Sequence, residues 1–194
     1  MDYHRRSIRL RGFDYREPRF YFITICADQQ RKIFGEILNG ESIPNQAGAI
    51  VHKCWDDLTH HFPNVRPDAF VVMPNHAHGI IQILSPGEVP SPVCLSNRQP
   101  KREFRGTKSG SVAAVVQNLK SVSTRRIRTL SRDRSLKIWQ RNYYEHIIRT
   151  EKSLNLIRLY IELNPRLWQE GIELRDVHFH SEDEIAQLLR KYRD

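Results

Sequence analysis

The stretch AFVVMPNHAHGIIQIL, residues Ala69–Leu84, decides the fold of this chain. It contains two runs rich in apolar and β-branched residues, Ala69–Met73 and His76–Leu84. Pro74-Asn75 lies between them and is typical of a turn. The stretch therefore predicts two consecutive strands joined by a short connection.

The second of these strands begins with two histidines. Alternate side chains of a strand point to the same face, so His76 and His78 share a face and Ala77 points to the other. Two imidazoles on one face can bind one divalent metal ion. The alternative is two unrelated histidines, one packed and one solvated. Because a closed structural zinc site needs four protein ligands, a metal site here would take a third ligand from elsewhere and leave positions open for substrate.

Further strands and helices are predicted on both sides of this stretch. Strand-like composition marks Arg19–Ala27, Lys32–Leu38, which the Asn39-Gly40 turn ends, and Lys137–Ile148. Helical spacing of apolar residues marks 45–62, a segment beginning near 111, 151–163, which Asn164-Pro165 ends, and 181–192. Strands outnumber crossovers, so we expect an α+β fold whose mainly antiparallel sheet has helices packed on it.

The 194 residues suit one domain with a core of ordinary size. We expect a basic N-terminal arm over 1–18, a single domain over 19–170 and a C-terminal extension with a short helix over 171–194. Within the domain, residues 85–110 contain four prolines and three glycines without periodicity, which predicts a loop insert.

Composition excludes several classes of protein. Hydrophobic residues make up 39% and charged residues 27%, which excludes a wholly disordered chain. No run approaches the roughly 18 apolar residues of a membrane span, and no apolar segment follows the N-terminus as in a secretory signal. Three cysteines without a pattern fit a reducing compartment. We therefore expect a cytoplasmic protein without a membrane partner.

The net charge of +9 is concentrated in one part of the sequence. Between Arg98 and Arg141 there are thirteen basic residues and two acidic ones, which leaves the rest of the chain slightly acidic. Such a block is typical of a protein that binds a polyanion, although a solvated basic face is the alternative. The candidate DNA-binding residues are Lys101, Arg102, Arg105, Lys108, Lys120, Arg125, Arg126, Arg128 and Arg141.

Aromatic side chains follow this block at Trp139, Tyr143 and Tyr144. Such rings can stack on unpaired bases. At alternate positions of a strand they are also typical of a core, and we favour the core interpretation.

A second candidate site lies on the helix predicted at 151–163. Tyr160 and Asn164 are four residues apart, so a phenol and an amide would project from one helix face. The alternative is a half-buried tyrosine followed by a C-terminal asparagine cap.

Four pieces of the sequence, taken in order, resemble the REP-associated tyrosine transposases, which belong to the single-strand DNA transposases with a His-hydrophobic-His (HUH) motif and one catalytic tyrosine. These pieces are Phe20–Cys26, Val71–His78, Trp139–Arg149 and Tyr160–Pro165, and the resemblance covers roughly residues 15–170. It implies a ferredoxin-like or RRM-like sheet with the HUH motif on a central strand.

The resemblance also implies the roles of the site residues. His76 and His78 would be metal ligands for Mg²⁺ or Mn²⁺, and Tyr160 would be the nucleophile. Asn164 occupies the position of a third metal ligand, which in related transposases can be Gln. Auxiliary candidates are Glu145, His146 and Arg158; as neighbours on a strand, Glu145 and His146 face opposite sides, so at most one can face the site.

The implied reaction is cleavage and rejoining of single-stranded DNA through a 5′-phosphotyrosine, on hairpins of the repetitive extragenic palindrome (REP) type, in a prokaryotic, nucleoid-associated setting. No phosphate-binding loop of the GxxxxGK[ST] kind is present, which fits rejoining without a nucleotide cofactor. Alternatives are a domesticated DNA hairpin-binding protein without strand transfer, a metal-dependent phosphodiesterase that uses water, and a rolling-circle initiator. Both a monomer and a homodimer fit the sequence.

Overall fold

The main sheet of the protein has four strands in the order β4-β5-β1-β6, and every neighbouring pair is antiparallel. The computed structural model describes residues 13–89 and 107–172 together with 186, 187, 189, 190 and 192. The strands are β1 (Phe20–Cys26), β4 (Val65–Val72), β5 (His76–Ile83) and β6 (Tyr144–Ile148). The histidine pair therefore begins an inner strand of the sheet.

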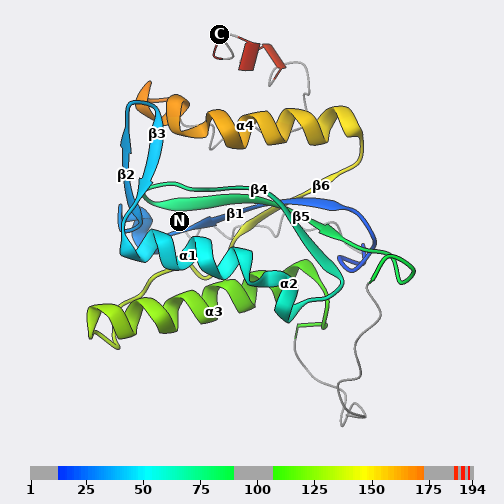
Figure 1. Ribbon diagram of the computed structural model, residues 1–194, viewed down its shortest axis with the longest axis horizontal. Helices are drawn as coiled ribbons and strands as arrows, with labels where there is room; N and C mark the ends of the chain where they lie inside the picture. Colours follow the sequence, from blue (N-terminus) through cyan, green and yellow to red (C-terminus); the bar gives the residue numbers. More distant parts are fainter. Residues whose placement is uncertain (1–12, 90–106, 173–185, 188, 191, 193–194) are drawn as a thin grey trace, which may run out of the picture.

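Helices cover both faces of this sheet, as Figure 1 shows. Helix α1 (Gln46–Asp56), the short α2 (Leu58–His61) and α3 (Val112–Ser131) lie on one face, and α4 (Glu151–Gln169) crosses the other. The order β1-α1-β4-β5-α3-β6 is the β-α-β-β-α-β arrangement of ferredoxin-like folds. The predicted α+β class, with an antiparallel sheet and the histidines on a central strand, is confirmed.

Strand alternation divides the core between the two faces. One cluster lies between the sheet and helices α1 and α3, and it includes Tyr21, Ile23, Ile25, Trp55, Ile81, Val115 and Leu119. The other lies between the sheet and α4, and it includes Phe22, Ile80, Ile148, Leu154, Ile157, Tyr160 and Leu167. The same alternation places His78 beside Thr24 and His76 beside Cys26 on the α4 face.

Gly79 marks a tight contact between the sheet and α1. A Cβ at this position would lie 2.3 Å from the Cη2 atom of Trp55. Trp55 is buried and stacks on Phe70, with ring centroids 4.2 Å apart, so its ring has little room to move. Only a residue without a side chain lets the indole approach the strand so closely.

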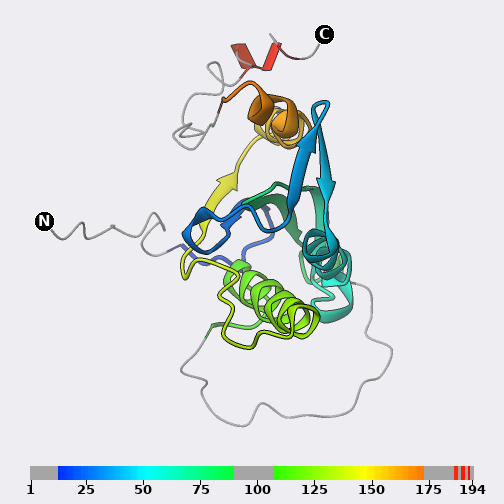
Figure 2. The same ribbon diagram turned by 90° about the vertical axis from the view of Figure 1, so that its left-hand side faces the viewer.

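A separate two-stranded hairpin, β2 (Gly35–Leu38) and β3 (Glu41–Pro44), runs from α1 to the end of α4 (Figures 1 and 2). Its turn residues Asn39 and Gly40 have φ angles of 52° and 75°, as the Asn-Gly turn signal predicts. The Gly40 N–H donates to Oε1 of Gln169 at 2.6 Å. The hairpin therefore binds the last turn of the helix that carries Tyr160.

Helix α4 does not end where the sequence predicts. Pro165 lies inside the helix, which continues to Gln169 because Leu167 is still buried against the sheet. Proline lacks the N–H that would bind the carbonyl of Ile161, so the helix loses one hydrogen bond there. The prediction that Asn164-Pro165 ends the helix was wrong because burial of the next turn outweighs that loss.

Other boundaries also differ from the sequence-based expectation. The predicted strand 137–148 is reduced to β6, and only an isolated bridge joins Trp139 to Ala27. The predicted helix 45–62 is divided between α1 and α2 at Asp57, and β3 was not predicted. Most of the arm at 1–18, of the insert at 85–110 and of the extension at 171–194 lies outside the described residues.

Candidate active site

The two histidines of β5 direct the same ring nitrogen at one point. The Nε2 atoms of His76 and His78 lie 2.9 Å apart. On the far side of each ring, Nδ1 of His76 lies 2.6 Å from Oδ1 of Asn75, and Nδ1 of His78 lies 2.8 Å from Oγ1 of Thr24. If each Nδ1–H donates to its oxygen, both Nε2 lone pairs face the same point. Hydrogen bonds to the other ring nitrogen orient metal-binding histidines in the same way.

Tyr160 approaches this point from helix α4. Its hydroxyl lies 3.2 Å from Nε2 of His78. Phe22 packs against both side chains, stacked on His78 at 5.4 Å and edge-on to Tyr160 at 6.1 Å between ring centroids. Tyr160 is only 3% exposed, so this buried wall of aromatic rings fixes the position of the phenol.

Burial controls the protonation of both groups. Desolvation holds the pKa of His78 well below its usual value, and repulsion from His76 lowers it further. Desolvation likewise raises the pKa of Tyr160, which a hydrogen bond with Asn164 partly offsets. At neutral pH the site therefore contains a neutral imidazole, which can bind a metal ion, and a neutral phenol.

Asn164 lies one helical turn after Tyr160 on the same face of α4. Its side chain is buried and hydrogen-bonded to Tyr160. The structure thus brings together all four residues that the sequence singled out: His76, His78, Tyr160 and Asn164.

The donor atoms fit a small divalent ion. Two ligands at adjacent corners of an octahedron, about 2.1 Å from its centre, lie about 3 Å apart. The 2.9 Å between the two Nε2 atoms matches this spacing. Among the described residues, no group of three or more His, Cys, Asp or Glu is placed to hold a metal. Asn164 offers an amide oxygen on the same helix face as Tyr160, a ligand type that hard divalent cations accept.

Two further side chains line the more exposed end of the site. The indole of Trp168 lies 5.8 Å from the His76 ring, and Nζ of Lys32 lies 5.7 Å from the indole centroid. His76 is half-buried whereas His78 is buried, so the pair is reached from this end. Sequence reasoning missed Trp168 because it ended the helix at Pro165; continuing it would have placed residues 160, 164 and 168 on one face.

The auxiliary candidates lie in three different surroundings. Glu145 faces the α1–α3 side of the sheet, where it is buried and accepts a hydrogen bond from the Tyr143 hydroxyl at 2.9 Å. His146 is paired with Phe22 on the α4 face. Arg158 forms two hydrogen bonds with Asp68, at 2.9 and 2.5 Å. Of the two candidates on β6, His146 shares the sheet face of the histidine pair and Glu145 does not.

Helix α3, which carries Lys120, Arg125, Arg126 and Arg128, lies on the opposite side of the sheet from α4, which carries Tyr160 (Figure 2). Nζ of Lys120 donates to the carbonyls of Gln140, Arg141 and Asn142 at 2.9 to 3.3 Å. Arg128 donates to the Leu136 carbonyl at 2.8 Å. The structure therefore gives these two side chains a role in holding the segment between α3 and β6.

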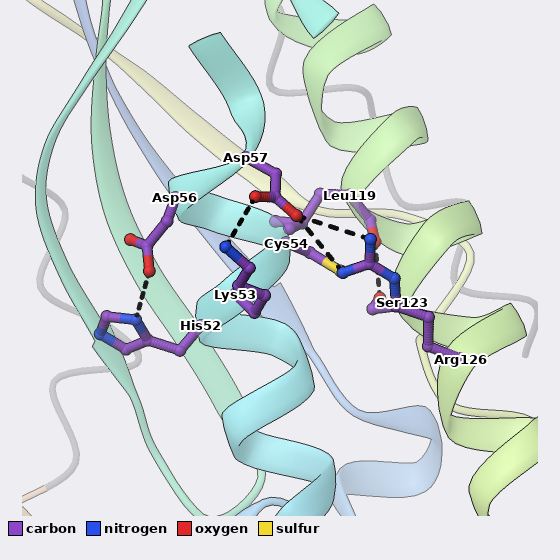
Figure 3. Close-up of polar contacts among 8 residues, drawn as sticks. All are labelled: His52, Lys53, Cys54, Asp56, Asp57, Leu119, Ser123 and Arg126. Atoms are coloured by element: carbon purple, nitrogen blue, oxygen red, sulfur yellow. Dashed lines mark hydrogen bonds and ion pairs between the residues drawn. The ribbon is translucent and has the colours of Figure 1, made fainter. Parts of the chain in front are cut away.

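Arg126 also binds a group of the protein itself. Figure 3 shows it reaching from α3 to Asp57 at the end of α1, where Lys53 also contacts the same carboxylate. Arg126 is nevertheless exposed, as are Lys108, Arg125 and Arg141. The remaining candidates, Lys101, Arg102 and Arg105, lie outside the described residues.

The aromatic side chains after the basic block pack into the core, as expected. Trp139 packs against Phe34 at 4.6 Å between ring centroids and donates Nε1–H to Ser123 at 2.9 Å. Tyr143 packs on the α1–α3 side and Tyr144 on the α4 side.

The fold is that of a REP-associated tyrosine transposase. The solved structure of such a transposase bound to a REP hairpin aligns with 89% of this chain and 76% of its own, at 18% identity and a TM-score of 0.52. A proposed transposase from Deinococcus radiodurans covers 79% of this chain and 95% of its own, at 15% identity and a TM-score of 0.42. The resemblance stated from the ordered motifs is confirmed at the level of the fold.

A protein with a similar sequence shows which family the chain belongs to. A Haemophilus influenzae protein, described as uncharacterized, is 43% identical over 168 residues, which are 87% of this chain and 92% of its own. The chain belongs to the same family as that protein. No protein-family model matches the chain. No helix in the described part of the chain is long and apolar enough to cross a bilayer.

Proposed function

We propose that the protein cleaves and rejoins single-stranded DNA, with Tyr160 as the nucleophile. One observation carries the proposal: the Tyr160 hydroxyl lies 3.2 Å from Nε2 of His78, at the point that Nε2 of His76 also faces. A phenol beside two convergent imidazole nitrogens is suited to attack a phosphate held there. The fold shared with a transposase bound to a REP hairpin supports DNA hairpins as the substrate class.

His76, His78 and Asn164 would hold a divalent ion, Mg²⁺ or Mn²⁺, through two imidazole nitrogens and an amide oxygen. When bound, such an ion acts as a Lewis acid on the scissile phosphate and aligns it for in-line attack. The contacts from Thr24 and Asn75 fix the two rings so that Nε2 faces the site.

Tyr160 would attack the phosphorus, so that a bond from its oxygen forms while the bond to the 3′ oxygen breaks. The products are a 5′-phosphotyrosine and a 3′-hydroxyl, which accounts for the phenolic proton. Because burial raises the pKa of Tyr160, the phenol must lose its proton as it attacks, and the hydrogen bond from Asn164 favours the phenolate. The phosphotyrosine keeps the energy of the broken diester for rejoining.

Labelled single-stranded hairpin DNA incubated with the protein and Mn²⁺ tests this proposal. We expect a covalent protein–DNA adduct on a denaturing gel, and its loss in Tyr160→Phe. Tyr144→Phe is the matched control, since Tyr144 is a tyrosine on the same sheet face that packs against Phe22. An adduct that persists in Tyr160→Phe would overturn the nucleophile assignment.

Two other outcomes favour the alternatives. Cleavage without any adduct would indicate that water attacks and that Tyr160 is structural. Binding without cleavage across good substrates would indicate a hairpin-binding protein without strand transfer. His76→Ala should abolish cleavage while most DNA affinity remains, because the exposed cations do not depend on the histidine.

A further inference from the structure

Trp168 lies beside the candidate site without packing in the core as the other tryptophans do. Trp55 is 2% exposed and stacked on Phe70, and Trp139 packs against Phe34 and hydrogen-bonds Ser123. Trp168 is half-buried like Trp139, but it lies at the end of α4 with its ring next to the more exposed histidine. An indole in this position gives an apolar surface at the entrance of a polar site.

Lys32 adds a positive charge at the same place. It lies between the 3-10 turn η1 (Asp28–Gln30) and β2, and its side chain is exposed. Its ammonium is 5.7 Å from the indole centroid, close to the limit of about 6 Å for a cation–π contact. Such a contact is weak, so the ammonium can move to a stronger anionic partner such as a phosphate.

The last turn of α4, which carries Trp168, is held in place by contacts on both sides of Trp168. Gln169 accepts a hydrogen bond from the Gly40 N–H of the β2–β3 hairpin, and Leu167 is buried against the sheet. Trp168 lies between these two anchored residues. The indole is therefore fixed relative to His76, eight residues beyond Tyr160 on the same helix.

We propose that Trp168 and Lys32 form a nucleotide subsite beside the histidine pair. A base next to the scissile phosphate stacks on the indole, and the Lys32 ammonium binds the phosphate of that nucleotide. This inference rests on the proposed function for its ligand, single-stranded DNA. Stacking platforms combined with cations are the usual way in which proteins bind unpaired nucleotides without reading their sequence.

Tryptophan fluorescence in the presence of EDTA tests the subsite separately from catalysis. Titration with a short single-stranded oligodeoxythymidylate should quench the wild-type emission, because a stacked base quenches an indole. Trp168→Phe should remove most of this quench while affinity stays close to wild type. Trp168→Ala should weaken the affinity about tenfold. Thermal unfolding of each variant shows whether the fold is retained.

Lys32 has its own measurement and a matched control. Lys32→Met should weaken binding and reduce the dependence of log K on log salt by about one phosphate contact. Lys152→Met, at the exposed first turn of α4 far from Trp168, should leave both unchanged. Equal salt dependence in the two variants would overturn the role of Lys32.

The outcomes separate this inference from the proposed function. An unchanged quench in Trp168→Phe together with unchanged affinity in Trp168→Ala would overturn the subsite, even if the wild-type protein forms the covalent adduct. A quench that depends on Trp168 would support the subsite even if no adduct forms, and only the chemistry assigned to Tyr160 would then fail.

Discussion

The two faces of the same sheet use polar residues differently. On the α4 face, His76, His78 and Tyr160 direct their polar atoms at one point with no cation among them. On the α1–α3 face, cationic side chains bind carbonyls and carboxylates of the protein itself, as Lys120 and Arg126 do. Charge counted along the sequence therefore does not measure the charge that remains for a ligand.

From this contrast, we expect one face to contribute mainly to stability and the other mainly to ligand binding. Substitutions facing α1 and α3 should change the free energy of unfolding and leave the site intact. Substitutions beside the histidines should change ligand binding and leave the fold intact. Three experiments test that separation, and a fourth compares one ion pair from each side of the sheet.

Gly79→Ala should have the largest effect on stability. The added Cβ would lie 2.3 Å from Trp55, so we expect a loss of about 3 kcal/mol in the free energy of unfolding. Urea denaturation measures the loss, and Gly87→Ala is the control because nothing lies within 4 Å of a Cβ there. Mn²⁺ binding by the folded variant should be unchanged. Equal stability of the two variants would contradict the tight contact.

Thr24→Val should act on the other face. It removes the oxygen that lies 2.8 Å from Nδ1 of His78, so His78 loses the contact that orients its ring. We expect Mn²⁺ affinity, measured by calorimetry, to fall 10- to 100-fold. The control variant Thr24→Ser keeps the hydroxyl and should retain most of the wild-type affinity. Wild-type affinity in Thr24→Val would show that the sheet alone orients the ring.

Lys120→Met should destabilise the protein by about 1.5 kcal/mol, because carbonyls that accept from Lys120 lose their donor.

Burial lowers the pKa of Lys120 to about 8, below its usual value of 10.5. Between these values the unfolded chain binds more protons than the folded one, so wild-type stability should rise with pH. Urea unfolding at pH 8 and 10 should show this rise in the wild type and in Lys152→Met but not in Lys120→Met.

The smallest effects come from two ion pairs with nearly the same exposure. Arg158–Asp68 and Arg126–Asp57 have side-chain exposures of 40%/20% and 41%/20%. The first has contacts of 2.5 and 2.9 Å, whereas the second has contacts of 3.4 and 3.5 Å. We expect Arg158→Ala to cost about 1 kcal/mol and Arg126→Ala to cost less. An equal loss in thermal unfolding would mean that geometry does not separate them.

The sequence predicted the sheet and the histidine face because both depend on local alternation. His76 and His78 share a face in any strand, and the apolar runs fix which segments are strands. The same local reasoning paired Tyr160 with Asn164 on a helix. The family resemblance predicted that this strand and this helix meet, because no local pattern brings His78 and Tyr160, 82 positions apart, together.

Long-range packing decides what the sequence did not predict. Pro165 is a strong local signal for a helix end, but the burial of Leu167 continues the helix and brings Trp168 to the site. The contact of Thr24 with His78 depends on strand register, and the engagement of Lys120 depends on carbonyls twenty residues away. Neither feature has a signature in the spacing of residues.

The proline inside α4 also has a mechanical consequence. Without an N–H at residue 165, the turn from Ile161 to Pro165 has one hydrogen bond fewer than its neighbours, so bending there costs less free energy than in an unbroken turn. The hairpin holds the helix beyond this soft turn, through Gln169. Bending at this turn would therefore move the Tyr160 hydroxyl relative to Nε2 of His78.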